Sequence, residues 1–435
     1  MGNTVSIQLN RYSITHKLIQ GLLIYSCLTI IFVMLKNTVS PIFGVIKDLV
    51  IFCSLFLLVN VRSRLSRIHL NFISIFFIIS LCSLFTSLSY SNLIYDYVYQ
   101  YKIDLFYVIS ILVFSLLFFN IKEQEVRTYL KIIVTFSLLN AIVAIAQRIF
   151  MFKFLGLVGF EDLDASNIPA LGNVDGLVLQ TQNGLFRSIG MMSTPMASAE
   201  LSLIGLFIFL YYKFKLSVFH LFIVCVFIVS IYFTGYKTVY LSCFAIIVSF
   251  VIPWLRLSII RAAGVVLFAF GFLSVNTSLI YNLTKNISPL YAEYSIRLRL
   301  EFVTKLFEQQ LQNFPFGLYA QNGNYLRVTE GAVPLDSMYI YTLSNYGFIG
   351  LVLSFLLLLV LFINMKVINI YVNSRAIPVG QYVFIFFASN YFFNQPFVNF
   401  PSGWHALILL MLALMQGKKI NKYVNYQKLP FSQCN

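Results

Sequence analysis

The chain has 435 residues, of which 59% are hydrophobic and only 10% are charged, and its mean hydropathy is +0.84. Soluble domains carry about 25% charged residues, so this composition excludes an ordinary water-soluble enzyme. Thirty Lys and Arg against fifteen Asp and Glu give a formal net charge of +15, which leaves nucleic-acid binding to be compared with membrane insertion.

Long apolar runs dominate the chain. A helix needs about 20 mainly apolar residues to cross the hydrocarbon core of a bilayer, and about twelve runs approach this length. They cover approximately residues 18–35, 41–59, 70–89, 103–120, 129–147, 196–212, 217–233, 238–255, 262–277, 347–364, 377–393 and 404–416. No cleavable signal pattern precedes the first run. We therefore expect an all-α integral membrane protein, with a single polytopic domain over residues 1–435.

Basic residues concentrate on one side of the membrane if the N-terminus is cytoplasmic, as the positive-inside rule requires. The segments on that side hold 18 of the 30 basic residues but only Glu123 and Glu125 of the acidic ones, giving +16 there and −1 elsewhere. They are the N-terminal tail, the loop around 62–67, residues 121–131, 213–215, 256–261 and 366–375, and the tail 417–435. The excess charge thus indicates topology, and we expect no nucleic-acid partner.

Two long external segments, 148–195 and 278–346, interrupt the helical pattern. Other external connections are short, and long loops on a rigid scaffold commonly carry function. The six cysteines and four histidines form no disulfide framework and no metal-binding spacing, so we expect neither a metal nor another cofactor.

The first long segment ends with an arginine between two glycines, in Gly184-Leu-Phe-Arg187-Ser-Ile-Gly190. Arg187 is suited to bind an anionic group near the bilayer surface. Its ordinary alternative is a surface arginine that is paired with an acid or extends toward water. Lys237, in the next short external turn, is either a second phosphate ligand or an interfacial lysine.

The second long segment carries a predicted helix. Glu293, Arg297, Glu301 and Lys305 are four residues apart and can form ion pairs along one face, so Arg297 has a structural alternative. Arg299 points about 200° around the helix from Arg297 and is available for a ligand.

Asp336 lies where the chain returns to the membrane, before Tyr339 and Gly347-Phe-Ile-Gly350. It is either a helix N-cap or a general base that orients an acceptor.

Ionisable residues also lie within the predicted spans, where they are costly and commonly functional. Lys47 and Asp48 are adjacent, so they either compensate each other or lie near a span boundary. Glu200 lies about one turn inside the outer surface, and we expect it to contribute to the site as a partner of Arg187.

Several patches from about residue 184 to 350 resemble the bacterial O-antigen ligase and O-antigen polymerase (Wzy-type) superfamily. Those patches are Phe186-Arg187 through Pro195, Thr234-Gly-Tyr-Lys237-Thr238, Arg297 with Arg299, Pro315-Phe-Gly317, Asp336-Ser-Met-Tyr339 and Gly347-Phe-Ile-Gly350. Lys237 departs from the arginine usual in the family, which keeps the charge but loses the bidentate fork.

The resemblance implies a metal-independent glycosyltransferase of the GT-C type, with about twelve transmembrane helices and a large periplasmic loop carrying helices. Its substrates would be glycans linked to undecaprenyl diphosphate, in the bacterial inner membrane, with both termini cytoplasmic and the active site periplasmic. Arg187, Lys237, Arg297 and Arg299 would then stabilise the diphosphate leaving group, with Asp336 as base or orienting group. Flippase and chain-length regulator proteins are implied as partners.

Related ligases usually carry a His near the position of Asp336, and this departure favours a repeat-unit polymerase. The ligase, which transfers glycan to lipid A core, remains one alternative. A flippase or transporter for the lipid-linked unit is a second alternative and would predict internal repeats, which we do not find. The second long external segment also carries tyrosines that could stack on sugar rings. Their alternative is membership of the aromatic belt at the membrane interface. These tyrosines are Tyr291, Tyr294, Tyr319, Tyr325 and Tyr339.

Overall fold

The computed structural model is largely helical, as the apolar runs predict. It describes residues 2–59, 70–75, 77–78, 81–82, 94–150, 172–174, 177–179, 181–182, 185–275, 325–328, 331–334, 338–373, 375–393 and 400–427. Its helices are α1 (Gly2–Cys27), α2 (Thr29–Thr38), α3 (Ile46–Leu58), α5 (Ile94–Leu117), α6 (Glu123–Ile149), α8 (Pro195–Ile208), α9 (Val218–Thr234), α10 (Lys237–Val251), α11 (Arg256–Val275), α14 (Met338–Asn364), α15 (Val379–Phe393) and α16 (Ser402–Gln427). Short 3-10 turns are Pro41–Gly44 and Phe118–Asn120, and Phe209–Lys213 continues α8 as a π-helix.

Three described helices are long and apolar enough to cross a membrane: Glu123–Ile149, Pro195–Lys213 and Tyr346–Asn364. A fourth span results if Asn10–Cys27 and Thr29–Thr38, which meet at 85°, are counted together. These helices make a multi-pass membrane location plausible, but they do not amount to the twelve predicted spans. Several helices that coincide with predicted spans are short. α3 has 13 residues and α10 has 15, and at about 1.5 Å per residue neither reaches across a core of about 30 Å.

In addition to its helices, the described part of the chain has four antiparallel two-stranded sheets in its connections, which the sequence did not predict. They pair β1 (Gly172–Val174) with β2 (Leu177–Leu179), β3 (Thr181–Gln182) with β4 (Leu185–Phe186), β5 (Tyr325–Val328) with β6 (Gly331–Pro334), and β7 (Ile370–Val372) with β8 (Arg375–Ile377). Strands of two to four residues are too short for a period-two hydrophobic pattern to reveal.

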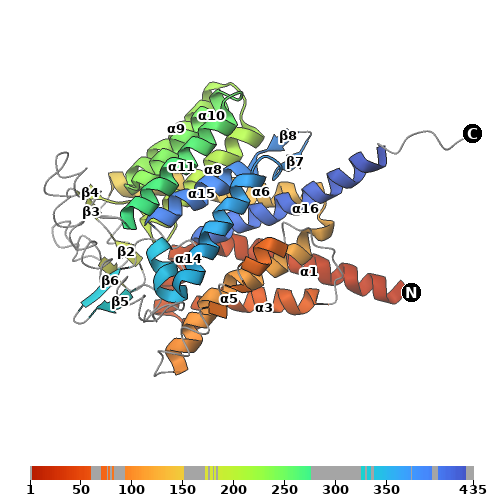
Figure 1. Ribbon diagram of the computed structural model, residues 1–435, viewed down its shortest axis with the longest axis horizontal. Coiled ribbons are helices and arrows are strands. Elements are labelled where there is room, and N and C mark those ends of the chain that lie inside the picture. Colours follow the sequence, from red (N-terminus) through yellow and green to blue (C-terminus); the bar gives the residue numbers. More distant parts are fainter. Residues whose placement is uncertain are drawn as a thin grey trace, which may run out of the picture.

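The helices run between two dissimilar ends of the molecule (Figure 1). The start of α1, the end of α16 and the β7–β8 hairpin lie at one end, and β2 to β6 lie at the other. Helix α8 is central, and all of its 14 residues are buried. Most of these residues are apolar, and the polar ones, Ser198, Glu200 and Ser202, are buried with them.

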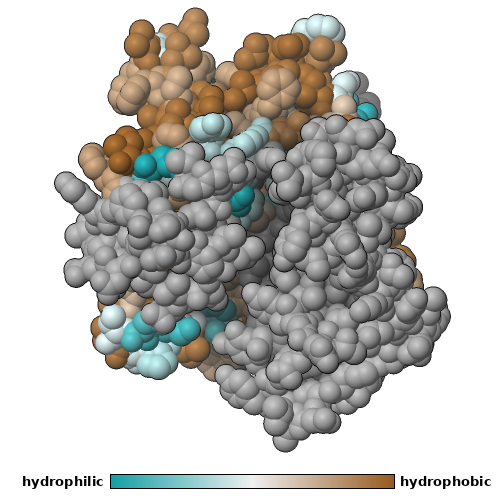
Figure 2. Space-filling model, turned by 90° about the vertical axis from the view of Figure 1, so that its left-hand side faces the viewer, coloured by the Kyte–Doolittle hydropathy of each residue, from teal (hydrophilic) through white to brown (hydrophobic). Residues whose placement is uncertain are grey.

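The outer surface carries hydrophobic side chains. Figure 2 looks onto the end with β2 to β6, and the upper part of that view, where α9 to α11 lie, is mainly hydrophobic. Phe222 and Phe244 are 63% and 64% exposed there, which is expected of a surface that meets lipid.

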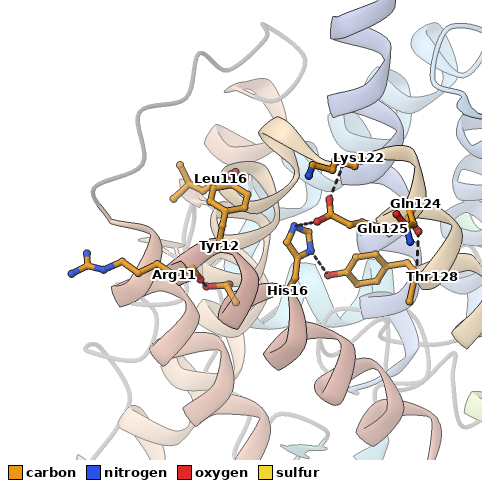
Figure 3. A network of polar contacts seen from close by, with 10 residues as sticks. Arg11, Tyr12, His16, Leu116, Lys122, Gln124, Glu125 and Thr128 are labelled. Atoms are coloured by element: carbon orange, nitrogen blue, oxygen red, sulfur yellow. Dashed lines mark hydrogen bonds and ion pairs between the residues drawn. The ribbon is translucent and has the colours of Figure 1, made fainter. Parts of the chain in front are cut away.

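A polar network joins α1 to α6 at the end of the molecule where the β7–β8 hairpin lies (Figure 3). We call this the terminal end. His16 Nδ1 lies 3.2 Å from the Tyr129 hydroxyl, and His16 Nε2 lies 3.7 Å from Glu125 Oε1. Tyr12 donates a 2.6 Å hydrogen bond to the carbonyl of Leu116. One face of α1 is thereby fixed against α5 and α6.

Candidate functional site

Residues 187–194, between β4 and α8, form an irregular segment that α6 holds with buried amides. Gln147 Oε1 accepts hydrogen bonds from the backbone N–H of Ile189 at 3.1 Å and of Gly190 at 2.7 Å. Gln147 Nε2 donates to the carbonyl of Gly190 at 2.7 Å. One side chain thus satisfies three backbone groups that no helix or strand pairs.

Asn140, two turns before Gln147 on α6, ties the same segment to α8. Its Oδ1 accepts from the backbone N–H of Met191 at 2.9 Å, and its Nδ2 donates to the hydroxyls of Ser198 and Ser202, each at 3.1 Å. Gly190 lies against this amide with φ +59°, and a Cβ there would lie 2.1 Å from Asn140 Oδ1. Only glycine fits both the backbone conformation and the space.

Helix α2 covers the segment from another side. Thr29 Oγ1 accepts from the backbone N–H of Ser193 at 3.0 Å, and the N–H of Ile30 donates to the carbonyl of Met191 at 3.1 Å. Ile30 also packs in a small apolar cluster with Phe186 and Ile189. The segment that carries Arg187 is therefore held by α2, α6 and α8 together.

Arg187 meets the turn between α9 and α10, as expected if the two predicted cationic patches form one site. Its guanidinium lies 5.3 Å from the ring centre of Tyr236, and the N–H of Ser188 donates to the carbonyl of Phe233 at 3.1 Å. Gly235 ends α9 in the left-handed conformation, with φ 77°. Lys237 is the first residue of α10, so the structure brings its backbone close to Arg187.

A second cation, Arg148, was not predicted. It is half-buried at the C-terminal end of α6, donates to the carbonyl of Phe186, and lies 5.7 Å from the ring centre of Phe233. Both Arg148 and Arg187 lie within electrostatic range of the Tyr240 hydroxyl. Among the residues that the structure describes, Arg148 forms no ion pair with a carboxylate.

The sequence of α6 does carry a signal for these polar contacts. Ser137, Asn140 and Gln147 recur at helical spacing on one face of an otherwise apolar run, and Arg148 follows directly. All three polar side chains of that face are buried. Polar residues on one face of a membrane helix indicate an interior contact.

Glu200 lies in a different part of the interior. It is 4% exposed and is two residues from both Ser198 and Ser202, so it points to the opposite side of α8 from α6. It interacts electrostatically with the hydroxyls of Tyr107 on α5 and Tyr382 on α15. The pairing of Glu200 with Arg187 stays a prediction.

The structure describes only some of the other residues that the sequence analysis singled out. Arg297, Arg299 and Asp336 lie outside the described residues, and Tyr339 is in the first turn of α14. Lys47 and Asp48 form an ion pair of 3.0 Å on α3, which confirms that they compensate each other.

The arrangement suits an anion, because two half-buried guanidinium groups lie on aromatic faces at the end with β2 to β6. Within the described ranges, no three His, Cys, Asp or Glu side chains are close enough to share a metal ion. No known protein family, curated protein or solved structure matches this chain.

Proposed function

We propose that the protein is a glycosyltransferase that polymerises oligosaccharide repeat units carried on undecaprenyl diphosphate. The observation that carries the proposal is the pair of guanidinium groups of Arg148 and Arg187, held together beside the turn that begins α10. A diphosphate leaving group develops charge as the sugar departs, and fixed cations that meet this charge accelerate the reaction.

In the proposed reaction, a hydroxyl of the acceptor repeat attacks the anomeric carbon of the donor glycan. The bond between that carbon and the diphosphate oxygen breaks, and Asp336 takes or orients the hydroxyl proton. Arg187 and Arg148 bind the diphosphate with Lys237, Arg297 and Arg299. Glu200 and Tyr339 contribute to glycan binding.

The proposal includes a twelve-helix GT-C architecture in the bacterial inner membrane. Both termini would be cytoplasmic and the site periplasmic, in accord with the distribution of basic residues. The product would be O-antigen or a related surface polysaccharide, and flippase and chain-length regulator proteins would be partners.

The first test supplies purified protein with lipid-linked repeat units alone. The polymerase predicts a ladder of lengthening glycans. Transfer that requires added lipid A core would instead identify a ligase, and movement of the lipid-linked unit across vesicles without a new glycosidic bond would identify a flippase.

The second test measures the kcat of variants of the site residues in the same assay. Arg148→Ala and Arg187→Ala should each lower kcat by about 100-fold, the usual effect of removing one fixed donor to a developing anion. Arg256→Ala is the matched control, because Arg256 also lies over an aromatic ring, 4.9 Å from the ring centre of Tyr211, but is the first residue of α11 and not part of the proposed site. Full activity of Arg148→Ala, Arg299→Ala and Asp336→Asn would reject the assigned site.

A further inference from the structure

A narrow apolar groove lies between α1 and α3, near the terminal end of the molecule and away from the arginine pair. Its volume is about 320 Å³, and its walls include Leu18 and Gly21 of α1 with Ile46 and Val50 of α3. Lys17 and Ile14 line the end nearer the N-terminus. The groove is therefore apolar along its length and cationic at one end.

The groove stays open for two reasons. Gly21 has no side chain, and a Cβ there would meet nothing within 4 Å. Helix α1 is fixed on another face through His16 and Tyr12 (Figure 3), so it cannot rotate to fill the space. At the far end, the Tyr25 hydroxyl donates a 2.8 Å hydrogen bond to the carbonyl of Phe43.

The apolar walls argue for a hydrocarbon chain in the groove. An acyl chain is narrow and flexible, and its transfer to an apolar surface is favourable.

Charge argues for an anionic headgroup at the end with Lys17. The Lys17 side chain is exposed, and Arg11 is exposed about two turns earlier on the same helix. A larger cleft of about 420 Å³ between α11, α14 and α15 offers a contrast, because its described lining residues are all apolar. The α1–α3 groove, in contrast, combines apolar walls with a lining cation.

We propose that the α1–α3 groove binds an anionic glycerophospholipid of the leaflet on the side of the N-terminus. One acyl chain lies along Gly21 and Val50, and Lys17 Nζ binds the phosphate. A basic residue at a membrane surface attracts anionic lipid by about 1 kcal/mol, so Lys17 should select phosphatidylglycerol over phosphatidylcholine by about fivefold.

The test titrates the full-length protein in detergent with each of these lipids and counts bound lipid by native mass spectrometry. Gly21→Phe should lower phosphatidylglycerol binding by about tenfold, since a Cβ at Gly21 meets nothing within 4 Å and the ring would occupy the groove. Val50→Trp, which fills the groove from α3, should act in the same way. Lys17→Gln should remove the preference for phosphatidylglycerol and leave phosphatidylcholine binding unchanged.

Two variants serve as matched controls. Ile228→Phe adds a ring on an exposed part of α9, and Lys215→Gln removes an exposed cation elsewhere. Both should bind lipid as the wild type does.

Three results would overturn the proposal. The first is a failure of the variants to act as expected. Either Gly21→Phe and Val50→Trp both bind lipid as the wild type does, or Lys17→Gln keeps the headgroup preference. The second is displacement of the lipid by excess inorganic phosphate, which would indicate a free-anion site. The third is a co-purifying helical partner that leaves with Gly21→Phe while the lipid count stays constant.

Discussion

Gly190 has a backbone conformation and a close packing contact that both exclude a side chain. A methyl group there would lie 2.1 Å from Asn140 Oδ1 and 2.7 Å from Ser198 Oγ, and φ is +59°. We expect Gly190→Ala to lower the free energy of unfolding by about 1–3 kcal/mol, measured by thermal unfolding in detergent. Gly21→Ala is the control and should be neutral or stabilising by up to about 1 kcal/mol. Equal stability of the two variants would contradict the prediction.

Gln147 is predicted to contribute more stability than an exposed glutamine of the same helix. Gln147→Leu leaves two N–H groups and one carbonyl of buried backbone without their partner. Each such group costs about 1–3 kcal/mol, so we expect a loss of at least about 3 kcal/mol in chemical unfolding. Gln124→Leu makes the same change at an exposed position of α6 and should alter stability little. A small effect of Gln147→Leu would show that water replaces the amide.

At this scale the sequence indicates the cations more readily than the residues that position them. Arg187 is conspicuous because glycines flank it, and the structure places it beside the predicted 234–238 turn. Asn140 and Gln147 are concealed within a long apolar run, where a hydropathy scan averages them away. Their role depends on backbone partners more than 40 residues along the chain, which local patterns cannot reveal.

At the scale of elements, the break between α1 and α2 is held by contacts with the segment before α8. Thr29→Val keeps the side-chain shape but removes the acceptor for Ser193 N–H. We expect a loss of about 1 kcal/mol in thermal unfolding, since a partly buried N–H is left without its partner. Thr38→Val is the control, because the exposed Thr38 hydroxyl bonds only to Met34 within α2. Similar losses in both variants would show that the bend does not depend on Ser193.

Apolar runs predict where most of the helices lie, because a membrane segment must be apolar whatever it packs against. They do not predict the 85° bend, since neither Pro nor Gly stands at Leu28. They also overestimate the length of one described helix. The run 41–59 includes the 3-10 turn Pro41–Gly44, so α3 begins only at Ile46.

For the whole molecule, the predicted topology can be tested by labelling single cysteines after the six native ones are replaced. Asn10, Lys36 and Lys366 are exposed and suit this purpose. A membrane-impermeant maleimide should label Lys36→Cys in intact cells, and it should label Asn10→Cys and Lys366→Cys only after permeabilisation. Labelling of Asn10→Cys in intact cells would reverse the orientation.

The buried amides of α6 also constrain how the chain is made. Helix α6 is synthesised before residues 189–202, which supply the partners of Asn140 and Gln147. When α6 first enters the bilayer, those two amides lack their final hydrogen bonds, and lipid offers none. Asn140 and Gln147 therefore reach their final hydrogen bonds only after residues 189–202 have been added beside α6.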